Sequence, residues 1–81
     1  MQKVLYIEDN QDIGNWVSRY LNERGYLVTW LKSAEHVMEH FSSADLVILD
    51  VMLPGLDGFT IGQRLKKKDA QIPILILSAL L

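Results

Sequence analysis

Three acidic side chains follow two short apolar runs of this chain. Glu8 and Asp9 come directly after the run KVLYI, and Asp50 closes the run DLVILD. If both runs are parallel strands of one sheet, their carboxyl ends form the edge at which such sheets bind ligands. Three carboxylates at one edge repel one another unless a divalent cation lies among them. The arrangement therefore suits a carboxylate that accepts a phosphoryl group with the help of Mg²⁺.

The segments that must position these carboxylates alternate between two hydrophobic periods. Short apolar or β-branched runs predict strands at residues 4–7, 26–31, 46–49 and 74–77. Three segments with helical spacing lie between them, which gives the order βαβαβαβ. This alternation predicts a parallel sheet covered by helices on both faces. Right-handed crossovers then place Glu8, Asp9 and Asp50 along one rim.

Each expected helix has an apolar face. The first face has offsets of 0, 3, 4, 7 and 8 and comprises Ile13, Trp16, Val17, Tyr20 and Leu21, with Gly25 as a left-handed C-terminal cap. The second helix has Ser33 as its N-cap and an apolar face of Val37, Met38 and Phe41. The third is capped by Asp57 and buries Phe59, Ile61 and Leu65. We therefore expect Trp16, Tyr20 and Phe59 in the core rather than stacked on a ligand.

Length and composition exclude several classes of protein. The 81 residues allow one domain at most, and 49% of them are hydrophobic, which is too many for a disordered tail. A net charge of −2 argues against a nucleic-acid surface within these residues, and the lysines at 66–68 are interpreted as the solvated end of a helix. The chain has no cysteine, no recognisable signal peptide and no apolar run of ~18 residues, which fits a cytoplasmic protein.

Together these residues resemble the receiver domain of two-component response regulators. The resemblance rests on the acidic pair after the first strand, on Asp50 with VMLPGLDG behind it, and on the Ser-Ala pair after the fourth strand. It implies a flavodoxin-like (CheY-like) doubly wound parallel sheet. Residues 1–81 would form the N-terminal two thirds of one such domain, without its final helix, strand and helix. The loop MLPGLDG is most similar to OmpR/PhoB-type regulators, which carry a winged-helix DNA-binding domain.

The resemblance also implies a role for each site residue. Asp50 would be the phosphoacceptor, which takes a phosphoryl group from a phosphohistidine of a sensor histidine kinase. Asp9 directly and Glu8 through water would hold Mg²⁺, and Asp50 with the main-chain carbonyl of Met52 would complete the protein ligands. Ser78 would supply the hydroxyl that contacts a phosphoryl oxygen and reports phosphorylation. The chain would then be a switch rather than a metabolic enzyme, in a transcription regulator that contacts DNA through another domain.

Two features of the family would lie beyond Leu81: an essential lysine after the fifth strand and a switch aromatic on that strand. A sheet that ends at residues 74–77 would also leave an apolar edge uncovered. We therefore expect two copies of the chain to form a homodimer or to exchange elements.

Other interpretations remain to be weighed against the receiver domain. A phosphohydrolase of the haloacid-dehalogenase type needs a second Asp two residues after its nucleophile, and this chain has Met52 there. A pseudo-receiver, which serves as a protein-interaction module without phosphorylation, stays open as the alternative. Magnesium binding that is lost on Asp50→Asn would argue against it.

Two metal-binding patterns in the sequence are incomplete. The segment HVMEH places His36, Glu39 and His40 in the pattern of a zinc peptidase, but no second helix supplies a third ligand, so we interpret it as a solvated helix face. The segment DNQDIG begins like a calcium-binding loop, yet Ile13 stands where an oxygen ligand is required.

Overall fold

The computed structural model describes residues 2–50 and 58–77, in which strands and helices alternate. In chain order they are β1 (Lys3–Ile7), α1 (Gln11–Glu23), β2 (Leu27–Leu31), α2 (Val37–Phe41), β3 (Leu46–Asp50), α3 (Gly58–Lys68) and β4 (Ile74–Leu77). The predicted order βαβαβαβ is confirmed.

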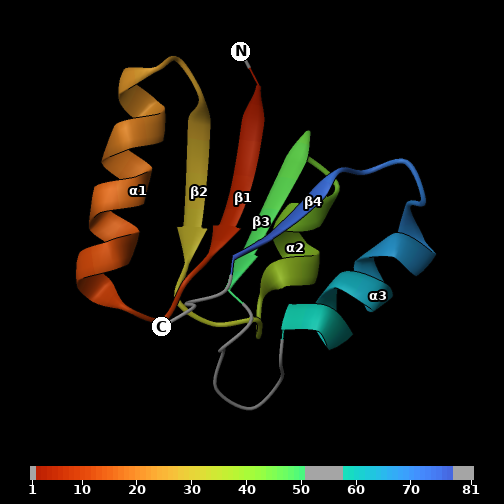
Figure 1. Ribbon diagram of the computed structural model, residues 1–81. Helices are drawn as coiled ribbons and strands as arrows, with labels where there is room; N and C mark the ends of the chain where they lie inside the picture. The colour runs from red at the N-terminus through yellow and green to blue at the C-terminus, as the bar shows by residue number, and fades with distance from the viewer. Residues whose placement is uncertain (1, 51–57, 78–81) are drawn as a thin grey trace.

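The strands form one parallel sheet in the order β2-β1-β3-β4 (Figure 1). α1 covers one face of the sheet, and α2 and α3 cover the other. In the pairing of β1 with β3, Ile7 lies opposite Leu49. The residues that come next, Glu8 and Asp50, therefore reach the same edge of the sheet. This register is what brings residues distant in sequence into one site.

The alternation of side chains along β1 divides the core into two clusters. Leu5 and Ile7 face α2 and α3, whereas Val4 and Tyr6 face α1. All four are buried, as expected for a strand with neighbours on both sides and helices on both faces. β1 is therefore the most enclosed strand of the described sheet, and the acidic pair follows it directly.

α1 turns a different face to the sheet from the one expected. Gly14 is buried, and Val17 and Leu21 pack against the cluster around Tyr6. Trp16 is 67% exposed and Tyr20 is 41% exposed, so the prediction that these two rings lie in the core is wrong. Their rings instead stack on each other at the surface, with centroids 5.4 Å apart.

The close approach of Trp30 to Gly14 explains this rotation. The indole ring of Trp30, on β2, lies against α1 where Gly14 has no side chain, and a Cβ at that position would overlap the ring atoms Cζ2 and Cε2. A bulky ring fits beneath the helix at this point because the facing residue is glycine. The helix consequently presents its Gly14 side to the sheet and leaves Ile13 exposed.

The second helix is shorter than expected. α2 begins at Val37, and the Ser33 hydroxyl accepts a hydrogen bond from the main-chain N–H of Glu35 rather than capping the helix. Val37 and Phe41 are buried as predicted, but Met38 is exposed, so its expected burial is wrong. A helix of 5 residues turns too few side chains toward the sheet to bury all three.

The remaining helix ends agree with the sequence where the structure describes them. Gly25 has a φ of 92°, the left-handed conformation expected of a C-terminal cap. Ile61 and Leu65 of α3 are buried as predicted, whereas Asp57 and the side chain of Phe59 lie outside the described residues.

Within residues 2–50 and 58–77, every helix is too short or too polar to cross a membrane.

We expect Leu5→Ala to destabilise the fold by roughly 2–5 kcal/mol, because the side chain is 1% exposed and its loss leaves a cavity. Leu75→Ala, on β4 of the same sheet, is the matched control. Leu75 is 51% exposed, so its truncation should cost about 1 kcal/mol at most. Urea unfolding of the two variants measures both values, and equal losses would contradict the assignment of the core.

Candidate metal centre

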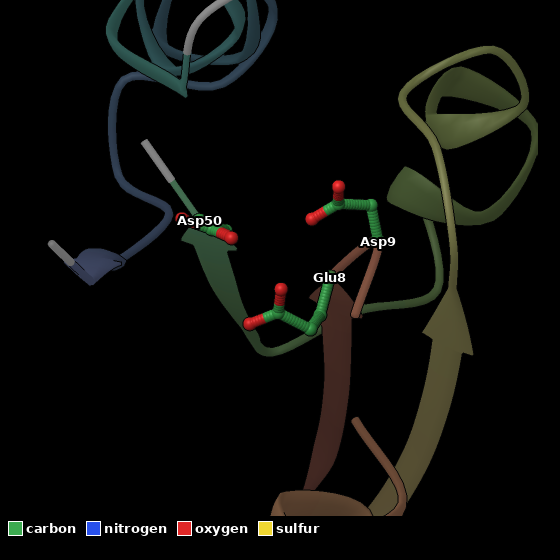
Figure 2. A group of neighbouring side chains, drawn as sticks. All are labelled: Glu8, Asp9 and Asp50. Atoms are coloured by element: carbon green, nitrogen blue, oxygen red, sulfur yellow. The ribbon is translucent and has the colours of Figure 1, made fainter. Parts of the chain in front are cut away.

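The three predicted carboxylates lie together at the carboxyl edge of the sheet (Figure 2). Glu8 and Asp9 follow β1, and Asp50 ends β3. One carboxylate oxygen of each lies within 4.8 Å of the others, and the three groups face a shared space between the ends of β1 and β3. Among the described residues, this is the one group of three or more acidic or histidine side chains placed closely enough to hold a metal ion.

The three carboxylates differ in their exposure to solvent. The side chain of Glu8 is buried, with 4% of the residue exposed, while Asp50 is partly buried and Asp9 is exposed. The site is therefore closed on the side of the core and open on the side of Asp9. A small ion can approach the carboxylates from that open side.

Polar contacts from both sides hold the Glu8 side chain. Its Oε1 accepts a hydrogen bond from the Tyr6 hydroxyl at 3.3 Å, and its Oε2 accepts one from the main-chain N–H of Asn10 at 3.2 Å. Buried carboxylates need such donors because burial removes their hydrogen bonds to water. Tyr6 and Asn10 are supporting residues that the sequence reasoning missed. A tyrosine two residues before an acidic pair was the available signal, because alternate residues of a strand share a face.

Asn10 connects the acidic pair to the first helix. Its side-chain Oδ1 accepts a hydrogen bond from the main-chain N–H of Ile13 at 3.0 Å, which makes it the N-cap of α1. Because its own N–H is bonded to Glu8, the turn at residues 8–10 is tied to both the strand end and the helix start.

Burial raises the pKa of Glu8 from 4.5 to about 7, and a hydrogen bond shared with the Asp50 carboxyl contributes to the rise, while the Asn10 N–H opposes it. Burial and the charge of Glu8 also raise the pKa of the Tyr6 hydroxyl. Glu8 is therefore partly protonated near neutral pH when no cation is bound. A cation among the carboxylates would favour the ionised form of Glu8, so metal binding would be coupled to proton release.

The donor set suits Mg²⁺. All the candidate side-chain ligands are carboxylate oxygens, the ligand type that this ion prefers, and they come from two adjacent strand ends. Mg²⁺ commonly keeps several waters and binds to one or two protein carboxylates, so an open site with few ligands fits it better than it fits zinc.

Two predicted site residues, Met52 and Ser78, lie outside the described residues.

The residues of the zinc-peptidase pattern do not form a metal site. His36 precedes α2, and its Nδ1 lies 3.2 Å from Oε1 of Glu39 in an exposed pair. The structure places no metal-binding group of three side chains in the described part of this segment. The interpretation of these polar side chains as a solvated helix face is thus supported for His36 and Glu39, which are exposed, whereas His40 is partly buried. The lysines at 66–68 are likewise exposed, as expected.

Comparison with known proteins identifies the family. The sequence model of the response regulator receiver domain family matches residues 4–80 of this chain. The chain belongs to the response regulator receiver domain family. It is 39% identical over 77 residues to YbdJ, an uncharacterized transcriptional regulatory protein of Bacillus subtilis, in a match that covers 95% of this chain and 34% of YbdJ. This receiver domain therefore spans about a third of the length of that relative.

Solved structures agree with this assignment. The response regulator TrrA from Thermotoga maritima, in complex with Mg²⁺–BeF, matches with a TM-score of 0.91 and 30% identity over 99% of this chain and 71% of its own. TrrA in complex with the histidine kinase ThkA matches with a TM-score of 0.89 and 31% identity over 98% and 70% of the two chains. The expected CheY-like parallel sheet is confirmed.

In the absence of divalent cations, we expect the wild type to lose stability relative to Glu8→Gln as the pH rises from about 5 to about 8. The pKa of Glu8 lies higher in the folded chain, at about 7, than its ordinary 4.5, so its stabilising protonation is complete below the lower value and is lost as the pH passes the higher one. Glutamine has a similar shape and stays neutral throughout.

Urea unfolding in the presence of a chelator, repeated across this pH range, gives the difference between the two proteins. If the difference in the free energy of unfolding between the wild type and Glu8→Gln stays constant across this pH range, the pKa of Glu8 is not raised.

Proposed function

We propose that this receiver domain accepts a phosphoryl group on Asp50. The observation that carries the proposal is the meeting of Asp50 with Glu8 and Asp9 at the open edge of the sheet. A lone strand-end aspartate could serve as a helix cap, but three carboxyl groups within 4.8 Å of one another have no such structural use, and their ionised forms repel one another without a cation.

The reaction is a transfer between two nucleophiles. A carboxylate oxygen of Asp50 forms a new bond to phosphorus, while the bond between phosphorus and a histidine nitrogen of the sensor kinase breaks. The nitrogen keeps the electron pair of the broken bond, and Asp50 becomes an acyl phosphate. A histidine kinase as the donor is supported by the structure of TrrA with ThkA, whose partner is such a kinase. The chain acts as a switch in this scheme rather than as a metabolic enzyme.

Asp9 and Asp50 would hold Mg²⁺ directly, with Glu8 acting through water and the main-chain carbonyl of Met52 as a further ligand. When bound, the ion offsets the negative charge that repels the acceptor and the incoming phosphoryl group. The exposure of Asp9 and the burial of Glu8 support this division, because the exposed carboxylate can turn toward an ion while the buried one is held by Tyr6 and Asn10. Ser78 would contact a phosphoryl oxygen and report phosphorylation.

The parent protein is proposed to be a cytoplasmic transcription regulator that contacts DNA through another domain. The names of relatives such as YbdJ and HprR, which are transcriptional regulatory proteins, support this. Pairing of two copies of the chain stays a prediction. The exposed apolar side chains of α1 and of β4, Trp16 and Leu75 among them, are consistent with it.

We expect incubation with acetyl phosphate and Mg²⁺ to add one phosphoryl group to the chain, and Asp50→Asn to abolish the gain. Asp45→Asn is the matched control, because Asp45 precedes the same strand at its opposite end and accepts a hydrogen bond from the Lys3 N–H there. Intact mass spectrometry, with and without Mg²⁺, measures the gain. Phosphorylation that persists in Asp50→Asn would refute the assigned acceptor. An unmodified wild type would leave two causes, a pseudo-receiver or the lack of the lysine that follows the fifth strand in the family, and the same assay on a chain that includes this strand would separate them.

We expect Asp9→Asn to weaken Mg²⁺ binding more than Glu8→Gln does, because a direct ligand contributes more than one acting through water. The loss for Glu8→Gln should be on the order of tenfold, the lower end of the cost of losing a supporting partner. Isothermal titration calorimetry of both variants measures the dissociation constants. The reverse order would assign Glu8 as the direct ligand.

A further inference from the structure

Trp30 of β2 lies beside Tyr6 of β1, opposite it in the register of the two strands. Both rings belong to the face of the sheet that α1 covers. Each has a polar tip that reaches Glu8: the Tyr6 hydroxyl donates to the carboxylate, and the Trp30 indole N–H donates to the main-chain carbonyl of Glu8 at 2.9 Å. Aromatic residues with a polar tip usually find such a partner when they are buried. Two neighbouring strands thus hold one acidic residue by different groups.

The main chain of Glu8 is held from β2 at both of its polar groups. Its N–H donates to the carbonyl of Leu31 at 2.9 Å, which continues the ladder between β1 and β2. Its carbonyl accepts from the Trp30 indole. If the two strands continued, a main-chain N–H of β2 would donate to this carbonyl. Because the pairing ends at Ile7 and Leu31, the Trp30 indole N–H donates to it instead. The peptide units on both sides of the Glu8 Cα are consequently fixed.

The Trp30 ring also contacts α1, the helix that follows the turn at residues 8–10. It lies against Gly14 so closely that a Cβ there would overlap it, and the Lys32 ammonium lies 5.7 Å from the ring centroid. The N–H of Gly14 donates to the carbonyl of Asn10 at 2.9 Å. Residues 8–10 are therefore bonded at one end to Trp30 and at the other end to the helical residue against which Trp30 packs.

We propose that Trp30 is a positioning residue for the Mg²⁺ site. Trp30 acts on this site through its hydrogen bond to the Glu8 carbonyl and through its contact with Gly14. The inference rests on the proposed function, because it concerns the same site. Trp30 touches neither an ion nor a reacting atom. It sets the direction in which the carboxylates of Glu8 and Asp9 leave the main chain, and so their approach to Asp50.

The indole N–H separates this role from ordinary packing. A ring that served the core alone could be replaced by another aromatic ring with little effect on the site. Trp30→Phe keeps an aromatic side chain but removes the donor to Glu8 and the Cζ2 and Cη2 atoms that contact Gly14. Trp16→Phe is the matched control, because it is the same substitution at the other tryptophan of the chain, which is exposed on α1.

The test measures Mg²⁺ dissociation constants by calorimetry for the wild type and for both variants. We expect Trp30→Phe to bind Mg²⁺ roughly three- to tenfold more weakly, the effect of losing one hydrogen bond, and Trp16→Phe to bind as the wild type does. Urea unfolding without metal is measured in parallel. Unchanged Mg²⁺ binding by a folded Trp30→Phe, or an equal loss in Trp16→Phe, would overturn the positioning role.

A second substitution tests the contact with Gly14. Gly14→Ala should weaken Mg²⁺ binding in the presence of Trp30, because the added methyl group displaces the ring. In the Trp30→Phe background the same change should have little further effect, since the overlapping atoms are gone. Additive losses would show that Gly14 acts independently of Trp30.

A spectroscopic measurement on the wild type needs no variant. The indole N–H resonance of Trp30 should shift on titration with Mg²⁺, and that of Trp16 should not. A Trp30 resonance that stays unchanged while Mg²⁺ saturates the site would overturn the inference but leave the proposed function intact. Absence of Mg²⁺ binding in the wild type itself would instead overturn the proposed metal site, and the positioning role with it.

Discussion

The burial of the Glu8 carboxylate beside Asp50 is the interaction on which the rest of the site depends. A buried acid next to a second carboxylate is electrostatically unfavourable, and the raised pKa of Glu8 expresses that strain. The fold tolerates it because donors surround the group: the Tyr6 hydroxyl and the Asn10 N–H reach its two oxygens. A bound cation, as proposed, would remove the repulsion that remains. The site is therefore built to be more favourable when it is occupied by positive charge than when it is empty.

The parallel sheet makes this arrangement possible with few residues. Glu8 and Asp50 meet because β1 and β3 are adjacent and run in the same direction, with Ile7 opposite Leu49. β1 carries apolar side chains to both faces, and the helices on those faces hold the strand in place. The acidic pair thus stands at the end of the most enclosed strand described, while Asp9 remains open to solvent.

The described fold follows from the sequence to the extent that short-range patterns specify it. Apolar runs located each strand, and the change of period located each helix. The face of α1 was predicted wrongly because Ile13, Trp16 and Tyr20 share helical spacing with Val17 and Leu21. The helical spacing of apolar residues gives α1 an apolar face that is wider than its contact with the sheet. The spacing does not show which part of that face packs against the sheet. The contact of Trp30 with Gly14 made that choice, and it joins residues 16 positions apart.

The sequence by itself determined the type and order of the elements and the identity of the three carboxylates, because strands, helices and turns depend on neighbours a few residues away. It also contained the motifs that resemble a receiver domain. The tertiary structure alone decided which aromatic side chains support the site. Trp30 looked like an ordinary strand residue, and its role became visible when β2 lay beside β1 and its indole reached the Glu8 carbonyl. A hydrogen bond between a side chain and the main chain 22 residues away leaves no periodic trace in the sequence, since it depends on the packing of the strand and the helix together.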